Sequence, residues 1–261
     1  MSALGIADDP TFAVRFFDAG NALPSVRALK SVMLDRLALQ RGLHVLEVGC
    51  GAGEDVRAIA RRVGPTGRVI GVDASAEIVE EATHRVDGRK LPIEFRVGDA
   101  LALELPDGSV DRCRMERVLM HVDGEPAQCV HEVARVLRPG GRAAIFDFDW
   151  DAFVIDGAGR ELTRRIVRSY SDAVRNGGVG RTLPRLLRDA GLVELAVIPH
   201  AVVIPYDFFG WIVSGHLDAA LAAGRFTPEE LIRWWDELDA AHERGRFFAA
   251  LLGFVVAGEK P

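Results

Sequence analysis

Short apolar runs alternate with longer amphipathic stretches along the first part of the chain. Five runs rich in β-branched residues predict strands, at 44–48, 68–73, 93–97, 110–115 and 142–148. The stretches between them have helical periodicity, at 54–63, 75–86 and 125–137. Glycine and proline clusters at 64–67 and 138–141 predict turns before the strands that follow. This alternation is typical of an α/β fold in which helices cover a mostly parallel sheet.

The flanking segments predict further elements. Upstream, residues 21–39 have the periodicity of an amphipathic helix. Downstream, the pattern predicts helices at 159–174 and 183–190, a strand at 192–204, helices at 207–223 and 228–244, and a last strand at 247–256. We therefore expect a single domain over residues 1–261. It would hold a Rossmann-like, mostly parallel seven-stranded sheet with helices on both faces and a ligand-binding core at about 40–150.

The two late helices have no place in a minimal doubly wound sheet. We interpret residues 206–244 as a helical insertion before the last strand. Its apolar residues, such as Phe209 and Trp211, exceed what a lone surface helix needs. We expect this insertion to cap the carboxyl edge of the sheet, facing His121 and Asp149, and to exclude water there.

Composition narrows the function classes. The chain has 261 residues and a formal net charge of −6, whereas nucleic-acid binders usually carry a basic domain or stripe. Its three cysteines, Cys50, Cys113 and Cys129, form no CxxC pair, which disfavours a disulfide framework or a zinc site. The first residues lack a signal pattern, and the apolar run at 247–257 is too short to span a bilayer. We expect a cytoplasmic protein with no membrane or nucleic-acid partner, either monomer or homodimer.

The strongest chemical signal is a glycine-rich turn between the first strand and the first helix of the core. Residues 45–54 read VLEVGCGAGE, so a G-x-G-x-G spacing follows Glu47. Glycines allow positive φ and let a ligand press against bare backbone. The dinucleotide fingerprint would need a further glycine at position 54, which is Glu54 here. The negative charge of Glu47 would repel a pyrophosphate and attract an ammonium or sulfonium, so an amino-acid-bearing nucleoside fits better.

Two more acids follow the next two predicted strands. Asp73 ends the second strand, about 20 residues after the glycine turn, where a carboxylate can accept hydrogen bonds from ribose hydroxyls. Asp99 follows the third strand, where it can accept from an exocyclic amine of adenine. Glu47, Asp73 and Asp99 therefore share the carboxyl edge of the sheet, where such folds bind ligands.

These motifs together resemble the class I S-adenosylmethionine (SAM)-dependent methyltransferases. The resemblance is to their small-molecule group, which includes the ubiquinone and menaquinone C-methylases. It rests on residues 46–53, 72–75, 98–100 and 133–141, which match the family's motifs in order and spacing. It implies SAM as cofactor, S-adenosylhomocysteine as product and a small-molecule substrate. The expected cofactor contacts are Glu47, Gly49, Cys50, Gly51, Asp73, Ala74, Asp99, Ala100 and Glu116.

Residues for the substrate lie outside the shared motifs. His121 resembles a histidine often found after the family's fourth strand, and its ordinary pKa suits a general base. A histidine simply hydrogen-bonded within the fold is the equal alternative. Asp149, Arg181 and Trp211 are further candidates for substrate contact, although a solvated loop end at 147–151 and a surface ion pair at Arg181 are the alternatives. Nothing in the spacing of the acids predicts a metal site.

Three other functions share parts of this pattern. Some proteins of this fold bind SAM without using its methyl group, so a cyclase or decarboxylase is the main alternative to transfer of a methyl group to oxygen, nitrogen or carbon. A nicotinamide-dependent oxidoreductase is disfavoured by Glu54, and a non-catalytic SAM-binding subunit would retain the same acids. Two hypotheses remain for the pathway, secondary-metabolite and quinone-type biosynthesis.

Overall fold

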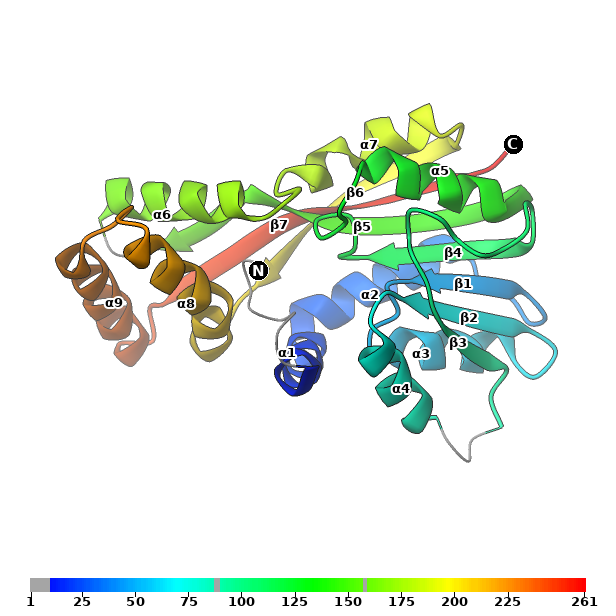
Figure 1. Ribbon diagram of the computed structural model, residues 1–261, viewed down its shortest axis with the longest axis horizontal. Coiled ribbons are helices and arrows are strands. Elements are labelled where there is room, and N and C mark those ends of the chain that lie inside the picture. The colour runs from blue at the N-terminus through cyan, green and yellow to red at the C-terminus, as the bar shows by residue number, and fades with distance from the viewer. Residues whose placement is uncertain (1–9, 87–89, 157–158) are drawn as a thin grey trace.

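A computed structural model describes residues 10–86, 90–156 and 159–261, in which seven strands form one sheet (Figure 1). The order across the sheet is β3-β2-β1-β4-β5-β7-β6. The strands are β1 (His44–Val48), β2 (Arg68–Asp73), β3 (Ile93–Val97), β4 (Val110–Glu116), β5 (Leu137–Asp156), β6 (Val193–Val203) and β7 (Phe248–Glu259). Strands β1 to β5 pair in parallel, and β7 runs antiparallel to both β5 and β6. The predicted Rossmann-like α/β fold is confirmed.

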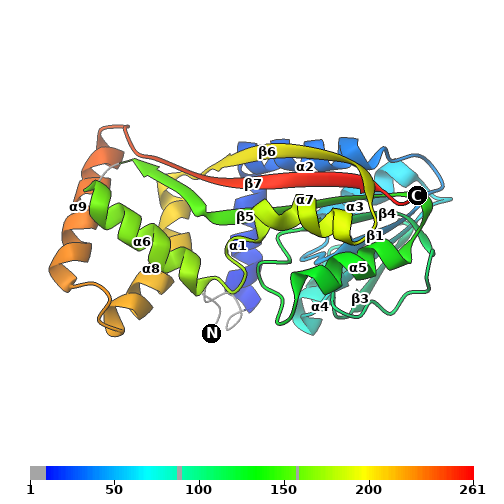
Figure 2. The same cartoon turned by 90° about the horizontal axis from the view of Figure 1, so that it is seen from above.

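Helices cover both faces of the sheet, so the residues of its central strands are mostly buried. Helix α2 (Pro24–Leu37) lies on one face, and α5 (Pro126–Val136) and α7 (Val179–Asp189) lie on the other (Figure 2). Helices α3 (Glu54–Val63) and α4 (Ala76–His84) follow β1 and β2 as the crossovers to the next parallel strands. None of the helices in the described ranges has both the length and the apolar composition that a bilayer crossing requires.

Strands β5 and β7 continue well beyond the carboxyl ends of β1 to β4 (Figure 1). Helices α6 (Arg160–Ala173), α8 (Tyr206–Ala222) and α9 (Pro228–Glu243) gather around this extension. The fully buried Trp234 of α9 donates a hydrogen bond of 3.0 Å from its indole nitrogen to the Thr163 hydroxyl of α6. Helices α8 and α9 stand between β6 and β7 in the chain, as the sequence predicts for the insertion.

The N-terminal region holds one helix more than the sequence predicts. The helix expected at 21–39 is observed as α2, which begins at Pro24, and an unpredicted helix, α1 (Pro10–Ala22), precedes it. Leu23 has extended backbone angles, φ −61° and ψ 132°, because the residue before a proline is disfavoured in helical conformation and Pro24 follows it. This break lets α1 turn away from α2 and lie near the carboxyl ends of the central strands (Figure 1).

Two predictions about residues that lie within β5 are wrong. Residues 138–141 form part of the strand and not a turn, because the backbone N–H of Gly140 donates to Lys260 and that of Lys260 donates to Gly141. The glycines are taken up by an irregularity in the pairing with β4, in the manner of a β-bulge. Residues 147–151 also lie within β5, with Asp147 and Asp149 buried, so the solvated loop end is wrong.

Candidate cofactor and substrate site

A cavity of about 560 Å³ lies at the carboxyl ends of β1, β2 and β4, within the size range of small-molecule pockets. Every residue expected to contact the cofactor lines it: Glu47, Gly49, Cys50, Gly51, Asp73, Ala74, Asp99, Ala100 and Glu116. His121 lines it too. The structure thus brings together residues that are far apart in the sequence, as the carboxyl edge of a parallel sheet requires.

The glycine turn is shaped for close approach on both sides. Gly49 and Gly51 have positive φ, 69° and 50°. A Cβ on Gly49 would meet Val118 at 2.2 Å, so this glycine lets the loop after β4 approach. A Cβ on Gly51 would meet nothing within 4 Å, and Gly51 lines the cavity. The open space beside Gly51 is a cradle that a side chain would fill, which is the fit that a bound nucleoside needs.

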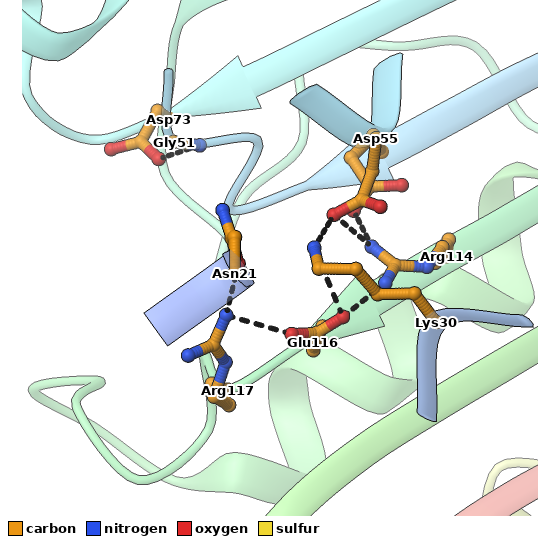
Figure 3. A network of polar contacts seen from close by, with 9 residues as sticks. Asn21, Lys30, Gly51, Asp55, Asp73, Arg114, Glu116 and Arg117 are labelled. Atoms are coloured by element: carbon orange, nitrogen blue, oxygen red, sulfur yellow. Dashed lines mark hydrogen bonds and ion pairs between the residues drawn. The ribbon is translucent and has the colours of Figure 1, made fainter. Parts of the chain in front are cut away.

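Asp73 and Asp99 stabilise the turns around this open space with hydrogen bonds from backbone N–H groups. One carboxylate oxygen of Asp73 accepts a 2.9 Å hydrogen bond from the backbone N–H of Gly51 (Figure 3), and the other accepts from that of Ser75 at 3.2 Å. Asp99 accepts from the backbone N–H of Leu101 at 2.8 Å. Carboxylate oxygens have further lone pairs, so Asp73 and Asp99 can still accept from hydroxyls or an amine in the cavity.

Cys50 lines the same turn without the properties of a nucleophile. Burial raises the pKa of its thiol far above the ordinary value, and the negative charge of Asp73 raises it further. The thiol therefore stays protonated at neutral pH, whereas a reactive cysteine needs its thiolate.

A cluster of charged side chains lines the inner part of the cavity, and the contacts among Lys30, Asp55, Arg114 and Glu116 are drawn in Figure 3. We call Glu47, Arg114, Asp55, Lys30 and Glu116 the floor cluster. Arg114 is fully buried on β4; its guanidinium contacts Glu47 and Glu116, and lies 3.3 Å from Asp55. Lys30 of α2 contacts Asp55 and lies 3.7 Å from Glu116. The floor cluster therefore joins α2, α3, β1 and β4 beneath the cavity.

Within the floor cluster, two glutamates have opposite pKa shifts. Burial raises the pKa of Glu47, against the attraction of Arg114. Burial works in the same direction on Glu116, but Lys30, Arg117 and Arg114 together hold its pKa below the ordinary value. Oxygen Oε2 of Glu47 accepts no hydrogen bond from any residue that the structure describes. A buried acceptor without a partner is costly, so a donor such as an ammonium in the cavity would complete it.

Four further residues of the site were not predicted from the sequence: Lys30, Asp55, Arg114 and Arg117. One signal was available on β4, where residues 112, 114 and 116 place charges at alternate positions of an otherwise buried strand. Lys30 offered no such signal, because a single lysine on an amphipathic helix is usually exposed.

The outer part of the cavity is lined by α1 and by the loop after β4. Phe16, Phe17, Asp18 and Asn21 of α1 line it, with Arg117 and His121 from the loop. His121 is exposed at the cavity mouth. Its pKa is lowered, first by the protein that displaces water around it and then by the positive charge of Arg117. The imidazole is therefore neutral at physiological pH, the form that can take up a proton.

The other three substrate candidates lie away from this cavity. Arg181 forms an ion pair with the buried Asp149 through two nitrogens, and lies 3.2 Å from Asp151. Trp211 is 46% exposed, and its ring packs beside Phe12 at a centroid distance of 6.0 Å. None of the three candidates is among the lining residues that the structure describes, and their contact with a substrate stays a prediction.

The insertion reaches the cavity only indirectly in the described part of the chain. No residue of α8 or α9 lines the cavity. Phe208 of α8 stacks on Phe16 of α1 at 4.9 Å, and Phe16 lines the cavity. Helix α1 therefore stands between the insertion and the site. A cap formed by residues 206–244 remains a prediction.

Comparison with known proteins shows which family this chain belongs to. Residues 45–141 match the model of a methyltransferase domain. The chain is 31% identical over 175 residues to a demethylmenaquinone methyltransferase of Symbiobacterium thermophilum, a match that covers 59% of this chain and 69% of that protein. This chain belongs to the class I SAM-dependent methyltransferases. The methyltransferase uses SAM as its cofactor, and within its family it resembles the quinone C-methylases.

Two further matches extend beyond the matched domain. An uncharacterized 37.1 kDa protein in transposon TN4556 of Streptomyces fradiae is 41% identical over 251 residues, which are 94% of this chain and 71% of that protein. A solved structure of phosphoethanolamine N-methyltransferase 2 of Haemonchus contortus, in complex with SAM, superposes with a TM-score of 0.61. It is 17% identical and the match covers 95% of this chain and 56% of that one, so this likeness concerns the fold of the methyltransferase.

Proposed function

We propose that this chain transfers the methyl group of SAM to oxygen, nitrogen or carbon of a small molecule, in secondary-metabolite or quinone-type biosynthesis. The observation that carries the proposal is the open cradle beside Gly51, whose N–H is tied to Asp73 at 2.9 Å. The demethylmenaquinone methyltransferase supports a quinone-type pathway by its name alone. Helix α1, which supplies part of the outer wall of the cavity, lies outside the matched domain.

Different residues of the chain would bind different parts of the cofactor. Asp73 would accept hydrogen bonds from the ribose hydroxyls and Asp99 from the adenine amine. Glu47 would accept from the ammonium through its unpartnered oxygen. The backbone of Gly49, Cys50 and Gly51 would form the wall against the nucleoside.

SAM, when bound, supplies a methyl group already activated by the positive charge on sulfur. The protein therefore contributes mainly position and charge. The acids beneath and beside the cradle favour a cation. The outer wall of Phe16 and Phe17 would keep water from the reacting groups, and His121 would take a proton where the acceptor must lose one.

Two linked measurements test this proposal. Calorimetric titration should show binding of SAM and S-adenosylhomocysteine and no binding of a nicotinamide dinucleotide. SAM with a deuterated methyl group, incubated with the protein and the small-molecule fraction of a cell extract, should then yield a product carrying the deuterated methyl. Binding of SAM with no deuterated product from any extract would reject methyl transfer and favour the cyclase or decarboxylase alternative.

A further inference from the structure

The loop after β4, residues 117–123, forms part of the cavity wall without regular secondary structure. It begins at Arg117 with a φ of +58°, a region that residues with a Cβ rarely adopt. Within the loop, the backbone N–H of His121 donates to the carbonyl of Val118 at 2.9 Å and forms a turn. A strained backbone persists only where the surrounding structure imposes it, so contacts from other segments must hold this loop.

Asn176 supplies three of these contacts from the connection between α6 and α7. Its side-chain Nδ2 donates to the carbonyls of Leu119 at 2.9 Å and Val122 at 3.3 Å. Its backbone N–H donates to the carbonyl of Met120 at 3.3 Å. A side-chain amide has two N–H donors, so both are engaged. The three carbonyls lie on both sides of His121 in the sequence, and the loop is therefore fixed on either side of that residue.

The turn that carries Asn176 packs closely against β5. The backbone N–H of Trp150 donates to the carbonyl of Gly177 at 2.8 Å. A Cβ on Gly180 would lie 2.7 Å from the carbonyl oxygen of Asp147, so glycine allows the two backbones to approach there. Strand β5 thus sets the place of Asn176, and the side-chain amide in turn sets the place of the loop.

Met120, the residue before His121, is held at three atoms. Its N–H donates to the buried carboxylate of Asp147 at 3.3 Å, and its sulfur accepts from the indole nitrogen of Trp150 at 3.3 Å. Asn176 holds its carbonyl. Of these three partners, Asn176 is the one whose contacts in the described ranges continue past His121. Its side chain therefore joins the two halves of the loop.

A second contact to the end of the loop is weaker. Arg175 pairs with Asp123, but 54% and 87% of these two side chains are exposed. Exposed ion pairs contribute little, because water and salt screen them. The hold on the loop after His121 therefore depends chiefly on Asn176.

We infer that Asn176 is a positioning residue for methyl transfer, which holds the backbone on both sides of His121 so that the imidazole stays at the mouth of the cofactor cavity. The inference rests on the proposed function, in which His121 takes the acceptor's proton. Asn176 is not among the lining residues that the structure describes, so it acts through the loop and not on SAM or the acceptor. Misplacing a reacting group by about 1 Å can cost about 100-fold in rate.

Measurements on the loop itself test the inference without any turnover. Asn176→Ala removes both side-chain donors but keeps the backbone bond to Met120, so it should fold. By mass spectrometry, the amides of residues 118–122 should exchange with deuterium at least about tenfold faster than in the natural protein. In NMR titration, the lowered pKa of His121 should rise toward its ordinary value of about 6.5, because a looser loop admits water.

Two other variants accompany this measurement. Asn176→Asp has the shape of asparagine but no donor for the carbonyls, and it should show the same faster exchange, even where Asn176→Ala does not fold. Ser25→Ala is the control, because the Ser25 hydroxyl also donates to the carbonyl of a distant segment, Val203 at 3.3 Å, but lies outside the cavity. It should leave both loop readouts unchanged. Exchange in the Asn176 variants as slow as in the natural protein overturns the inference.

Transfer then links the loop to the reaction. Tritiated SAM at saturation is offered with a dilution series of the small-molecule fraction of a cell extract. The maximal rate should fall at least about tenfold in Asn176→Ala, while SAM affinity by calorimetry stays within about twofold. A purely structural role would lower both together, and that result, or an unchanged maximal rate, overturns the inference. No label from the natural protein would instead reject the proposed function, and with it the role of Asn176 in transfer.

Discussion

Asp73 accepts a hydrogen bond of 2.9 Å from the backbone N–H of Gly51, which ties the end of β2 to the glycine turn after β1. The bond joins the residue expected to hold a ribose to the residue expected to leave space for it. A change at either position should therefore act on cofactor binding before it acts on the rest of the fold.

Replacing Asp73 should weaken the binding of SAM. Asp73→Ala removes two expected charge-assisted hydrogen bonds to the ribose, each worth about 1.5–3 kcal/mol, so calorimetry should show a loss of affinity of at least about tenfold. Asp111→Ala is a matched control, because Asp111 also accepts a backbone hydrogen bond, from His44 at 2.7 Å, but does not line the cavity. Equal SAM affinity in folded Asp73→Ala and in the natural protein would reject the assignment.

Filling the cradle should abolish binding by a steric route. Gly51→Val places a branched side chain in the open space and adds the strain of a positive φ, about 1–2 kcal/mol. Gly245→Val is the control, since Gly245 also has a positive φ and open space around its Cβ but lies outside the cavity. We expect similar small losses of thermal stability in both variants, and loss of SAM binding in Gly51→Val alone. A Gly51→Val protein that binds SAM tightly would mean that the cavity beside Gly51 is not the site.

The floor cluster should be essential to the fold. Arg114→Met leaves Glu47, Asp55 and Glu116 buried without their shared partner, and breaking a buried pair on one side typically costs about 3–5 kcal/mol. Urea unfolding measures this loss. Arg142→Met provides the comparison, because Arg142 is 43% exposed beside Glu259 and should cost less than about 1 kcal/mol. Equal stability of the two variants would show that the floor cluster contributes nothing.

Asp147 should make stability depend on pH in a defined direction. Burial raises its pKa to about 7, against backbone hydrogen bonds from Met120 and Phe148. The folded state then binds a proton more readily than the unfolded state, so this group's contribution to stability falls as pH rises from about 4 to about 7. Asp147→Asn keeps an acceptor but does not titrate. Urea unfolding at pH 5 and pH 8 should show that the natural protein loses on the order of 2–4 kcal/mol relative to this variant. An unchanged difference between the two proteins at both pH values would contradict the shift.

Most of the residues expected to bind the cofactor could be predicted from the local sequence pattern. Gly51, Asp73 and Asp99 could be predicted because each follows a short apolar strand, and the fold brings the ends of parallel strands together. Arg114 and Lys30 could not be paired in advance, since their shared partners, Asp55 and Glu116, lie far apart in the sequence. The length of β5 could not be predicted from the sequence for a related reason. Its glycine-rich start looks like a turn until pairing with residues 258–260 of the C-terminus is known.

The residues around the expected substrate were harder to predict, because their roles depend on contacts between distant parts of the chain and on backbone conformation. Arg181 and Asp149 each fitted substrate contact, but they satisfy one another in an ion pair. Helix α1 supplies the outer wall, although it lies outside the matched domain and its break from α2 depends on the Leu23–Pro24 junction. The positive φ of Arg117 leaves no trace in composition or periodicity.

We propose that SAM binds and gives up its methyl group in the cavity beside Gly51 and Asp73. The most direct measurement follows tritium from the methyl group of SAM into the small-molecule fraction of a cell extract, with the natural protein and with Asp73→Ala side by side. We expect label in a small molecule, with an equal amount of S-adenosylhomocysteine, for the natural protein, and at least about tenfold less label for the variant. No labelled small molecule with the natural protein, or equal label with both proteins, would contradict it.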